Sequence, residues 1–356
     1  MKESSKIKDQ IRKKETHSSK LKCPLERSLY LPFFSLVDYR NNQFSSADPE
    51  KILEFYDGFS NREQLIQWMK ERPKGVNTIY EVNGNKDIIV VIPTADYNGK
   101  YAIECRENIF KDLHLIFVES GGKEDFYFNY AHNSNMGLKR AVEYNPKWIV
   151  ISNDDMIKKT EVNELKLELR RYKPENFDVL FAKQNEIHSR FNTIGPWNVV
   201  GRLIINLSEH IPGFILKYLH KHAFQNIEQI ILIFRNIAMV DKIKKKFGPT
   251  LFNISYSKYS KYFQKILFKY ILTADFAIFS SEFLSKEGGI LYDETFINGC
   301  EDDDLCIKIF HENRRVKVLN YSIDSIGRGS LGDKLDRTLR TIASDIYLES
   351  KIESIV

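Results

Sequence analysis

The chain has 356 residues, of which 42% are apolar and 13% aromatic, so it can form one large α/β domain or two ordinary domains. A disordered polymer is excluded because 53 basic residues nearly balance 48 acidic ones in a chain this apolar. Four cysteines without a CxxC pair exclude a disulfide scaffold and a zinc ribbon. No apolar run approaches the roughly 20 residues of a membrane span. The N-terminus is charged throughout, so we expect a cytoplasmic protein without a signal peptide.

The net charge of +5 is distributed unevenly along the chain. Residues 202–270 contain 12 basic and 3 acidic side chains, and residues 1–22 contain 8 basic and 3 acidic ones. The remainder of the chain is therefore acidic. We expect a flexible basic tail over 1–22 and a basic helical insert over 201–272. Such asymmetry concerns binding partners rather than the fold.

An accessory helical segment is predicted for residues 23–85. Asp48 and Pro49 are typical of an N-cap and a first helical turn. Residues 60–63 have capping-box spacing for a second helix, which Pro73 ends.

From residue 86 onward, short apolar runs, the first of them the β-branched run at 88–92, alternate with helical stretches. The runs predict strands at 88–92, 113–118, 148–151, 177–181, 276–280 and 316–319, with a further short strand at 126–130. Helices are expected at 101–109, after a cap at Ser134 or Asn135, at 161–171, around Leu305, and at 333–350. This alternation predicts an α/β domain with a mainly parallel sheet flanked by helices. Its two halves would be residues 86–200 and 273–356.

Polar residues follow three of these predicted strands, at 93–94, 119–122 and 153–155. Because ligands of such sheets bind outside the carboxyl ends of the strands, we expect these residues to line one crevice. The first strand is not followed by GxGxxG, and GxxxxGK[ST] occurs nowhere, so a dinucleotide site and a P-loop are poor interpretations.

Two acidic groups are candidates for chemistry. Asn153, Asp154 and Asp155 follow a buried strand and suit Mg²⁺ or Mn²⁺, although acids there could also cap a helix or solvate a loop. Residues 301–304 hold four consecutive acids, more than a helix dipole requires. Their mutual repulsion would raise one pKa, as suits a general base.

In this order the motifs resemble those of the family-two glycosyltransferases, which have the GT-A fold. The matching segments are VIPT at 91–94, FVESG at 117–121, NSNMGL at 133–138 with Ala141, ISNDD at 151–155, and FINGCEDDDL at 296–305. The resemblance implies an inverting transfer of a sugar from a nucleotide-diphosphate sugar to a hydroxyl of a glycan or lipid-linked acceptor.

Carried over by position, the resemblance also implies residue roles. The donor would be contacted by Pro93, Thr94, Glu119, Asn135 and Asp154. A divalent cation, manganese or magnesium, would be held by Asp155 with Asn153 or Asp154. Asp302 would be the catalytic base, and Glu301 beside it would orient the acceptor.

The sequence departs from the family pattern at two places. Asn153 stands where the metal motif usually begins with aspartate. The segment 325–330 lacks the histidine that many members carry, and Arg328 in that segment could contact phosphate or be solvated. A catalytically silent sugar-nucleotide or membrane-binding module is therefore an alternative. A nucleotidyltransferase is another, although residues 94–99 are not the glycine-rich basic loop expected for one.

The basic insert has amphipathic helical spacing. A stripe of aromatic and apolar residues runs beside Lys258, Lys261, Lys265 and Lys269. Four more lysines lie within residues 242–246. This pattern is typical of helices on an anionic membrane surface, which would make the protein peripheral to the inner face of a membrane. Packing on the core with the lysines in water, or oligomerisation through 201–272, are the alternatives. No nucleic-acid-binding module accompanies the charge.

Overall fold

The computed structural model describes residues 39–120, 127–183, 239, 242–243, 246–247, 275–297, 299–326 and 335–355. From Asn41 onward these residues belong to one compact unit, and of the other unit, Met1–Arg40, only Tyr39 and Arg40 are described. The predicted tail at 1–22 and most of the predicted insert at 201–272 lie outside the described residues.

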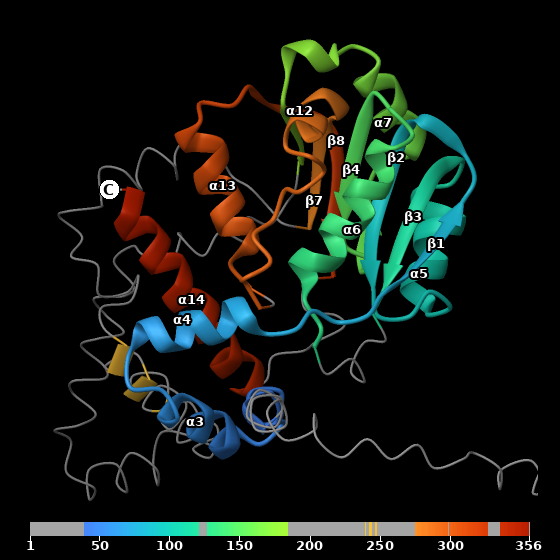
Figure 1. Ribbon diagram of the computed structural model, residues 1–356. Coiled ribbons are helices and arrows are strands. Elements are labelled where there is room, and N and C mark those ends of the chain that lie inside the picture. Colours follow the sequence, from blue (N-terminus) through green and yellow to red (C-terminus); the bar gives the residue numbers. More distant parts are fainter. Residues whose placement is uncertain are drawn as a thin grey trace, which may run out of the picture. The chain divides into compact units, whose positions relative to one another are not determined.

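One eight-stranded sheet forms the centre of the larger unit (Figure 1). Its strands lie in the spatial order β1-β3-β2-β4-β7-β6-β8-β5. Their bounds are β1 (Thr78–Val82), β2 (Asn85–Thr94), β3 (Leu113–Glu119), β4 (Trp148–Ser152), β5 (Met156–Lys158), β6 (Val179–Lys183), β7 (Phe276–Ser280) and β8 (Val316–Ser325).

The sheet is mixed, which corrects the prediction of a mainly parallel one. β2 pairs in parallel with β3 and β4, and β6 with β8, whereas β1–β3, β4–β7, β6–β7 and β5–β8 are antiparallel. Among the described strands, β2, β3, β4, β6 and β8 run one way and β1, β5 and β7 run the other. The chain leaves β6 and enters β7 at the same edge of the sheet, so β7 must run back between β4 and β6.

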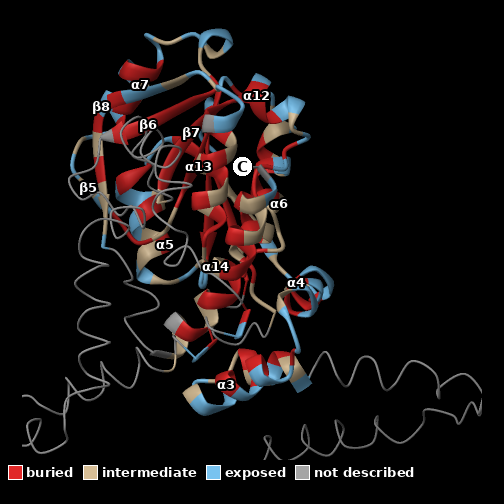
Figure 2. Ribbon diagram, turned by 90° about the vertical axis from the view of Figure 1, so that its left-hand side faces the viewer, coloured by how far each residue is buried: buried red, intermediate tan, exposed pale blue. Residues whose placement is uncertain are grey.

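Helices cover both faces of the sheet. They are α3 (Pro49–Asp57), α4 (Arg62–Glu71), α5 (Lys100–Glu104) with a π-helical continuation (Cys105–Ile109), α6 (Tyr130–Val142), α7 (Val162–Leu169), a 3₁₀ turn (Pro174–Asn176), α12 (Ser281–Lys286), α13 (Glu301–His311) and α14 (Leu335–Ile355). Alternate residues of β2 belong to two apolar clusters, one shared with α5 and α7 and the other shared with α6, α12 and α13. Both sides of its 88–92 run are therefore buried, as expected for a central parallel strand. The strand β7 is likewise buried along its length (Figure 2).

A third apolar cluster lies away from the sheet. It joins α3, α4 and α14 with one side of α13 and with Ile243 and Phe247 of the basic insert. The hydroxyl of Tyr56 donates to the backbone oxygen of Leu339 at 2.7 Å, which ties α3 to α14. The N-terminal helices therefore pack against the C-terminal helix of the same unit.

The described part of the basic insert packs on α3. Lys246 Nζ donates to the backbone oxygen of Tyr56 at 3.0 Å, and Lys242 Nζ lies 3.3 Å from Asp57 Oδ2. Ile243 and Phe247, on the other side of this turn, are buried. The described residues 242–243 and 246–247 therefore contact α3 through both apolar and lysine side chains.

Some predicted boundaries were confirmed and others moved. Asp48 caps α3, accepting from the Glu50 amide at 3.0 Å. The cap of α4 is Asn61, one residue later than the predicted capping box, and it accepts from the Gln64 amide. The segment 23–85 is not only helical, because Thr78–Val82 forms an edge strand and Asn85 begins β2.

The helix α6 begins earlier than predicted. Asn129 is its N-cap, accepting from the His132 amide at 2.8 Å, so Ser134 and Asn135 lie inside the helix rather than capping it. The prediction of a strand up to residue 130 was therefore wrong at its described end. Asn129 Nδ2 also donates to the backbone oxygens of Glu294 and Phe296, and these distant contacts stabilise the extra turn.

Candidate functional site

The carboxyl ends of three parallel strands lie at one edge of the sheet. Thr94 stands opposite Glu119 in the register of β2 and β3, and Asn153 directly follows β4. The amino end of the antiparallel strand β7 is at the same edge, because Ser152 pairs with Phe276. The edge therefore gathers the polar residues that the strand ends were predicted to present.

Asp154 is anchored to the first of these strands. Thr94 Oγ1 donates to Asp154 Oδ2 at 2.7 Å, and Cys105 Sγ donates to the Asp154 backbone oxygen at 3.2 Å. Burial raises the pKa of Asp154, the bond from Thr94 lowers it, and the charge of Asp155 raises it again, with a net increase. This carboxyl group is partly desolvated and held in a fixed direction.

Glu119 holds the loop that follows β2. Its Oε2 accepts from the Tyr97 amide at 2.6 Å. The Tyr97 ring stacks on Tyr80 with centroids 4.3 Å apart, and the guanidinium of Arg106 lies 4.8 Å from the Tyr97 centroid. Pro93 is buried within β2. Sequence reasoning missed the tyrosine pair because it did not predict β1, the strand that carries Tyr80.

Asn153 connects the strand ends to α6. Its Nδ2 donates to Asp275 Oδ1 at 2.9 Å, and its Oδ1 accepts from the Tyr130 hydroxyl at 3.0 Å. Asp275 Oδ2 accepts in turn from Ser325 Oγ at 2.6 Å. Asp275 and Tyr130 were not predicted as site residues. The available signal was that Asp275 directly precedes the apolar run at 276–280. It indicates a residue at the candidate edge only if that strand is antiparallel to β4.

Asp155 is the more buried of the two adjacent aspartates, with 5% of its surface exposed. Its backbone oxygen accepts from the Ile326 amide at 2.8 Å, which joins the loop after β4 to the end of β8. Within the described ranges, no group of three or more His, Cys, Asp or Glu side chains is arranged to hold a metal ion.

The residues at this edge nevertheless fit a hard divalent cation. Mg²⁺ typically uses one or two protein carboxylates and completes its shell with phosphate oxygens and water. Asp154 and Asp155 offer two adjacent carboxyl groups, and their mutual charge opposes ionisation of Asp154. A cation would relieve that repulsion.

Asn135 has a structural role. Its side chain is fully buried, and Oδ1 accepts from the amides of Leu291 and Tyr292. Its Nδ2 donates to the Tyr292 backbone oxygen and to Glu294 Oε1. These bonds use both ends of the amide to clamp α6 to the loop before α13, so we leave Asn135 out of the proposed donor site.

The four acids at the start of α13 differ in their surroundings. Glu301 Oε2 accepts from the Gly299 amide at 2.6 Å, in a tight turn where Cys300 has φ of 68°. Asp304 Oδ2 is 2.8 Å from Lys351 Nζ of α14. Asp303 is buried and Asp302 is half-buried. All four acids lie in the first turn of α13, and Asp304 ties this turn to α14.

Two tyrosines lie between this turn and the strand ends. The rings of Tyr130 and Tyr292 meet edge to face with centroids 6.2 Å apart. Burial raises the pKa of Tyr130 well above its ordinary value, and Tyr292, Glu301 and Asp275 raise it further. Burial likewise raises the pKa of Tyr292, and Asp302 and Glu301 add to that increase. The pKa of Tyr130 is thus raised by an acid directly before β7 and by an acid at the start of α13.

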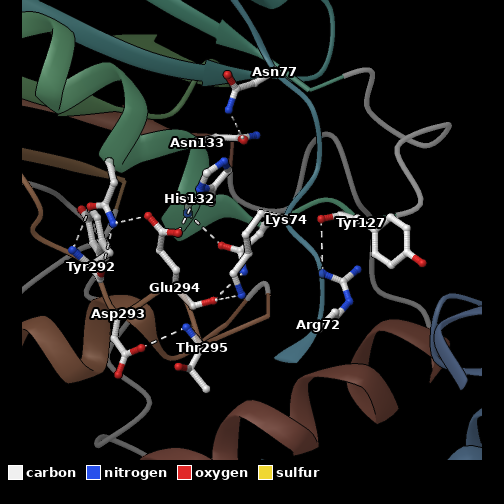
Figure 3. A network of polar contacts seen from close by, with 12 residues as sticks. Arg72, Lys74, Asn77, Tyr127, His132, Asn133, Tyr292, Asp293, Glu294 and Thr295 are labelled. Atoms are coloured by element: carbon white, nitrogen blue, oxygen red, sulfur yellow. Dashed lines mark hydrogen bonds and ion pairs between the residues drawn. The ribbon is translucent and has the colours of Figure 1, made fainter. Parts of the chain in front are cut away.

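A polar network fixes the loop between α12 and α13 (Figure 3). His132 Nδ1 lies 2.9 Å from Glu294 Oε2, and Lys74 Nζ donates to the Glu294 backbone oxygen at 2.6 Å. Burial raises the pKa of Glu294, but bonds from Asn135 and His132 hold it below its ordinary value. His132 thus bonds to the side chain of Glu294 in this loop, which holds α6 against the start of α13.

Several predicted residues lie outside the described residues. They are Arg328 and the four lysines of the proposed membrane surface, Lys258, Lys261, Lys265 and Lys269. In the parts of the chain that are described, no helix is both long and apolar enough to cross a membrane. Comparison with family models and with curated proteins finds no match to the chain.

Proposed function

We propose that the chain is an inverting glycosyltransferase that moves a sugar from a nucleotide-diphosphate sugar to an acceptor hydroxyl of a glycan or lipid-linked molecule. The observation that supports this most is the position of Tyr130. Its hydroxyl donates to Asn153 at the strand ends, and its environment includes the charges of Asp275 and Glu301. The strand-end acids and the acidic turn of α13 therefore flank the same aromatic pair.

In the proposed reaction the strand ends bind the donor. Thr94 and Glu119 lie side by side at the carboxyl ends of β2 and β3, where a nucleotide would lie. Asp155, with Asp154 beside it, would hold the cation. When bound, manganese or magnesium supplies positive charge to the diphosphate leaving group.

Asp302 is the proposed general base. It removes the proton from the acceptor hydroxyl, whose oxygen then attacks the anomeric carbon while the bond to the diphosphate breaks on the opposite face. One displacement of this kind inverts the configuration at that carbon. Glu301, held by the Gly299 amide, would orient the acceptor beside the base.

Nucleotide sugars should raise the melting temperature of the full chain. We expect one nucleotide-diphosphate sugar to stabilise it in the presence of Mn²⁺, by about 2.7 kcal/mol at 100 times its dissociation constant. A thermal-shift screen of such sugars, with Mn²⁺ or with a chelator, measures this. Nucleoside monophosphates are the control ligands. No stabilisation by any sugar of a complete panel would contradict the proposal.

Turnover separates the alternatives. A donor that binds but is never transferred to any acceptor in a glycan and lipid panel would favour a catalytically silent module. Release of inorganic diphosphate from a nucleoside triphosphate and a sugar phosphate would instead favour a nucleotidyltransferase. The proposed enzyme releases a nucleoside diphosphate.

We further propose that the basic insert holds the protein at an anionic membrane surface. Replacing Lys258, Lys261, Lys265 and Lys269 by glutamine should weaken binding to vesicles containing phosphatidylglycerol by up to about 10³-fold, since each surface lysine contributes about 1 kcal/mol. Co-sedimentation measures this. The matched control replaces by glutamine four exposed lysines that lie outside the insert, namely Lys51, Lys139, Lys147 and Lys286. Equal loss in both variants, or in neither, would favour packing of the insert on the core.

A further inference from the structure

The pairing of β4 with β7 sets Asn153 directly opposite Asp275. Ser152 pairs with Phe276 in the antiparallel register, so the next pair outward is Asn153 with Asp275. The backbone continues the pairing, since the Asn153 amide donates to the Asp275 backbone oxygen at 2.9 Å. The separation of the two side chains is therefore determined by the sheet and not by the loop that follows.

The side-chain bonds of Asn153 give its amide one orientation. Its Nδ2 faces Asp275 Oδ1 at 2.9 Å, and its Oδ1 faces the hydroxyl of Tyr130 at 3.0 Å. An aspartate at 153 would instead place two carboxylate oxygens at this distance, where like charges repel strongly. Asparagine at 153 is thus the residue that suits a carboxylate at 275.

Asp275 also belongs to the surroundings of Asp155. Ser325 Oγ donates to Asp275 Oδ2, and the next residue, Ile326, donates its amide to the Asp155 backbone oxygen. Two consecutive residues at the end of β8 therefore hold both aspartates. The negative charge missing at 153 is present one strand away.

We propose that Asp275 is a positioning residue of the donor site, which supplies the negative charge that Asn153 lacks and orients the Asn153 amide. This inference rests on the proposed function, because it assumes that the strand ends receive a divalent cation. It assigns a role to a residue outside the motifs that carry the family resemblance. It also removes Asn153 as evidence for a silent module.

The network predicts that the two residues can be exchanged. In the double variant Asn153→Asp with Asp275→Asn, the amide at 275 can donate to the carboxylate at 153 and accept from Ser325. The carboxylate at 153 can still accept from Tyr130. Every side-chain hydrogen bond is thus retained and the total charge is unchanged. The single variant Asn153→Asp instead sets two carboxylates against each other, and the single variant Asp275→Asn removes the negative charge.

The first measurement is thermal unfolding of the full chain in a chelator. We expect Asn153→Asp to lower the melting temperature by about 5 °C, as two opposed carboxylates should, and the double variant to recover most of this loss. Asp87→Asn is the control, an exposed aspartate at the opposite edge of the sheet whose carboxylate pairs with Lys147. An Asn153→Asp protein as stable as the parent would overturn the inference.

The second measurement is binding of Mn²⁺ alone, followed by loss of the free-ion electron paramagnetic resonance signal. We expect Asp275→Asn to weaken Mn²⁺ binding at least tenfold and the double variant to restore it to within about threefold of the parent. Undiminished binding by Asp275→Asn would overturn the inference, since a purely structural role leaves the metal site intact.

The measurement of Mn²⁺ binding needs no sugar, so it tests the role of Asp275 separately from the proposed glycosyltransferase activity. If the exchange restores both melting temperature and Mn²⁺ binding while no nucleotide sugar binds the parent, the inference holds and the proposed function fails. If the parent binds no Mn²⁺, the inference itself is overturned.

Discussion

Asp302→Asn is expected to bind the nucleotide sugar as the parent does and to lose transfer by about 10³-fold, within the range that general-base catalysis contributes. Asparagine keeps the size of the side chain but cannot accept the acceptor proton. Asp302 lies in the first turn of α13, where its charge acts on Tyr292, whereas the carboxyl group of Asp154 is bonded to Thr94 at the strand ends. Donor affinity from thermal shift and initial rates of nucleoside diphosphate release measure the two effects separately.

The same helix offers a matched control in Asp304→Asn. Asp304 faces Lys351 at 2.8 Å, and Lys351 keeps a second partner in Asp293 at 2.9 Å, so this variant should retain most of its activity with a small loss of stability. Equal rates for Asp302→Asn and the parent would remove Asp302 as the base. Equal losses in the two variants would point instead to a structural role for the acidic turn.

Gly137→Val is expected to destabilise the fold by about 3 kcal/mol or more, the upper part of the range for overpacked cores. A Cβ at Gly137 would lie 2.3 Å from Val91 Cγ1 and 2.9 Å from Val118 Cγ2. Both neighbours are fully buried β-branched residues on central strands, so they cannot rotate away. Only glycine lets α6 lie this close to β2 and β3.

Urea denaturation followed by circular dichroism measures this effect. The control is Lys139→Val, which places the same β-branched residue on the exposed side of the same helix and should cost less than about 1 kcal/mol. If Gly137→Val were as stable as Lys139→Val, this would contradict the close packing of α6 on β2 and β3. Because α6 carries Tyr130, partial loosening should also weaken Mn²⁺ binding.

Several elements were predictable because their signals are local. Short apolar runs predicted the strands β2, β3 and β4, and polar residues at the ends of these strands indicated one edge of the sheet as the candidate site. Asp48 followed by Pro49 located the start of α3, since capping depends only on neighbouring residues. The family resemblance was drawn from these same segments, and its functional content is still a proposal.

Other features depended on contacts between distant segments. The start of α6 moved because Asn129 bonds to backbone oxygens more than 160 residues away. Asn135 looked like a donor contact from its motif, but its partners lie in the loop before α13. The four acids at 301–304 cannot be told apart in the sequence, whereas in the structure Asp304 bonds to Lys351 of the C-terminal helix.

The α/β character, the polar strand ends and the asymmetric charge could all be inferred from the order of residues, because apolar periodicity, caps and composition are properties of short segments. The antiparallel direction of β7 between β4 and β6 is apparent only in the folded chain, since strand direction depends on the edge at which the chain re-enters the sheet. That direction alone places Asp275 opposite Asn153. The charge that the motif lacks is therefore visible in the folded sheet and not in the order of residues.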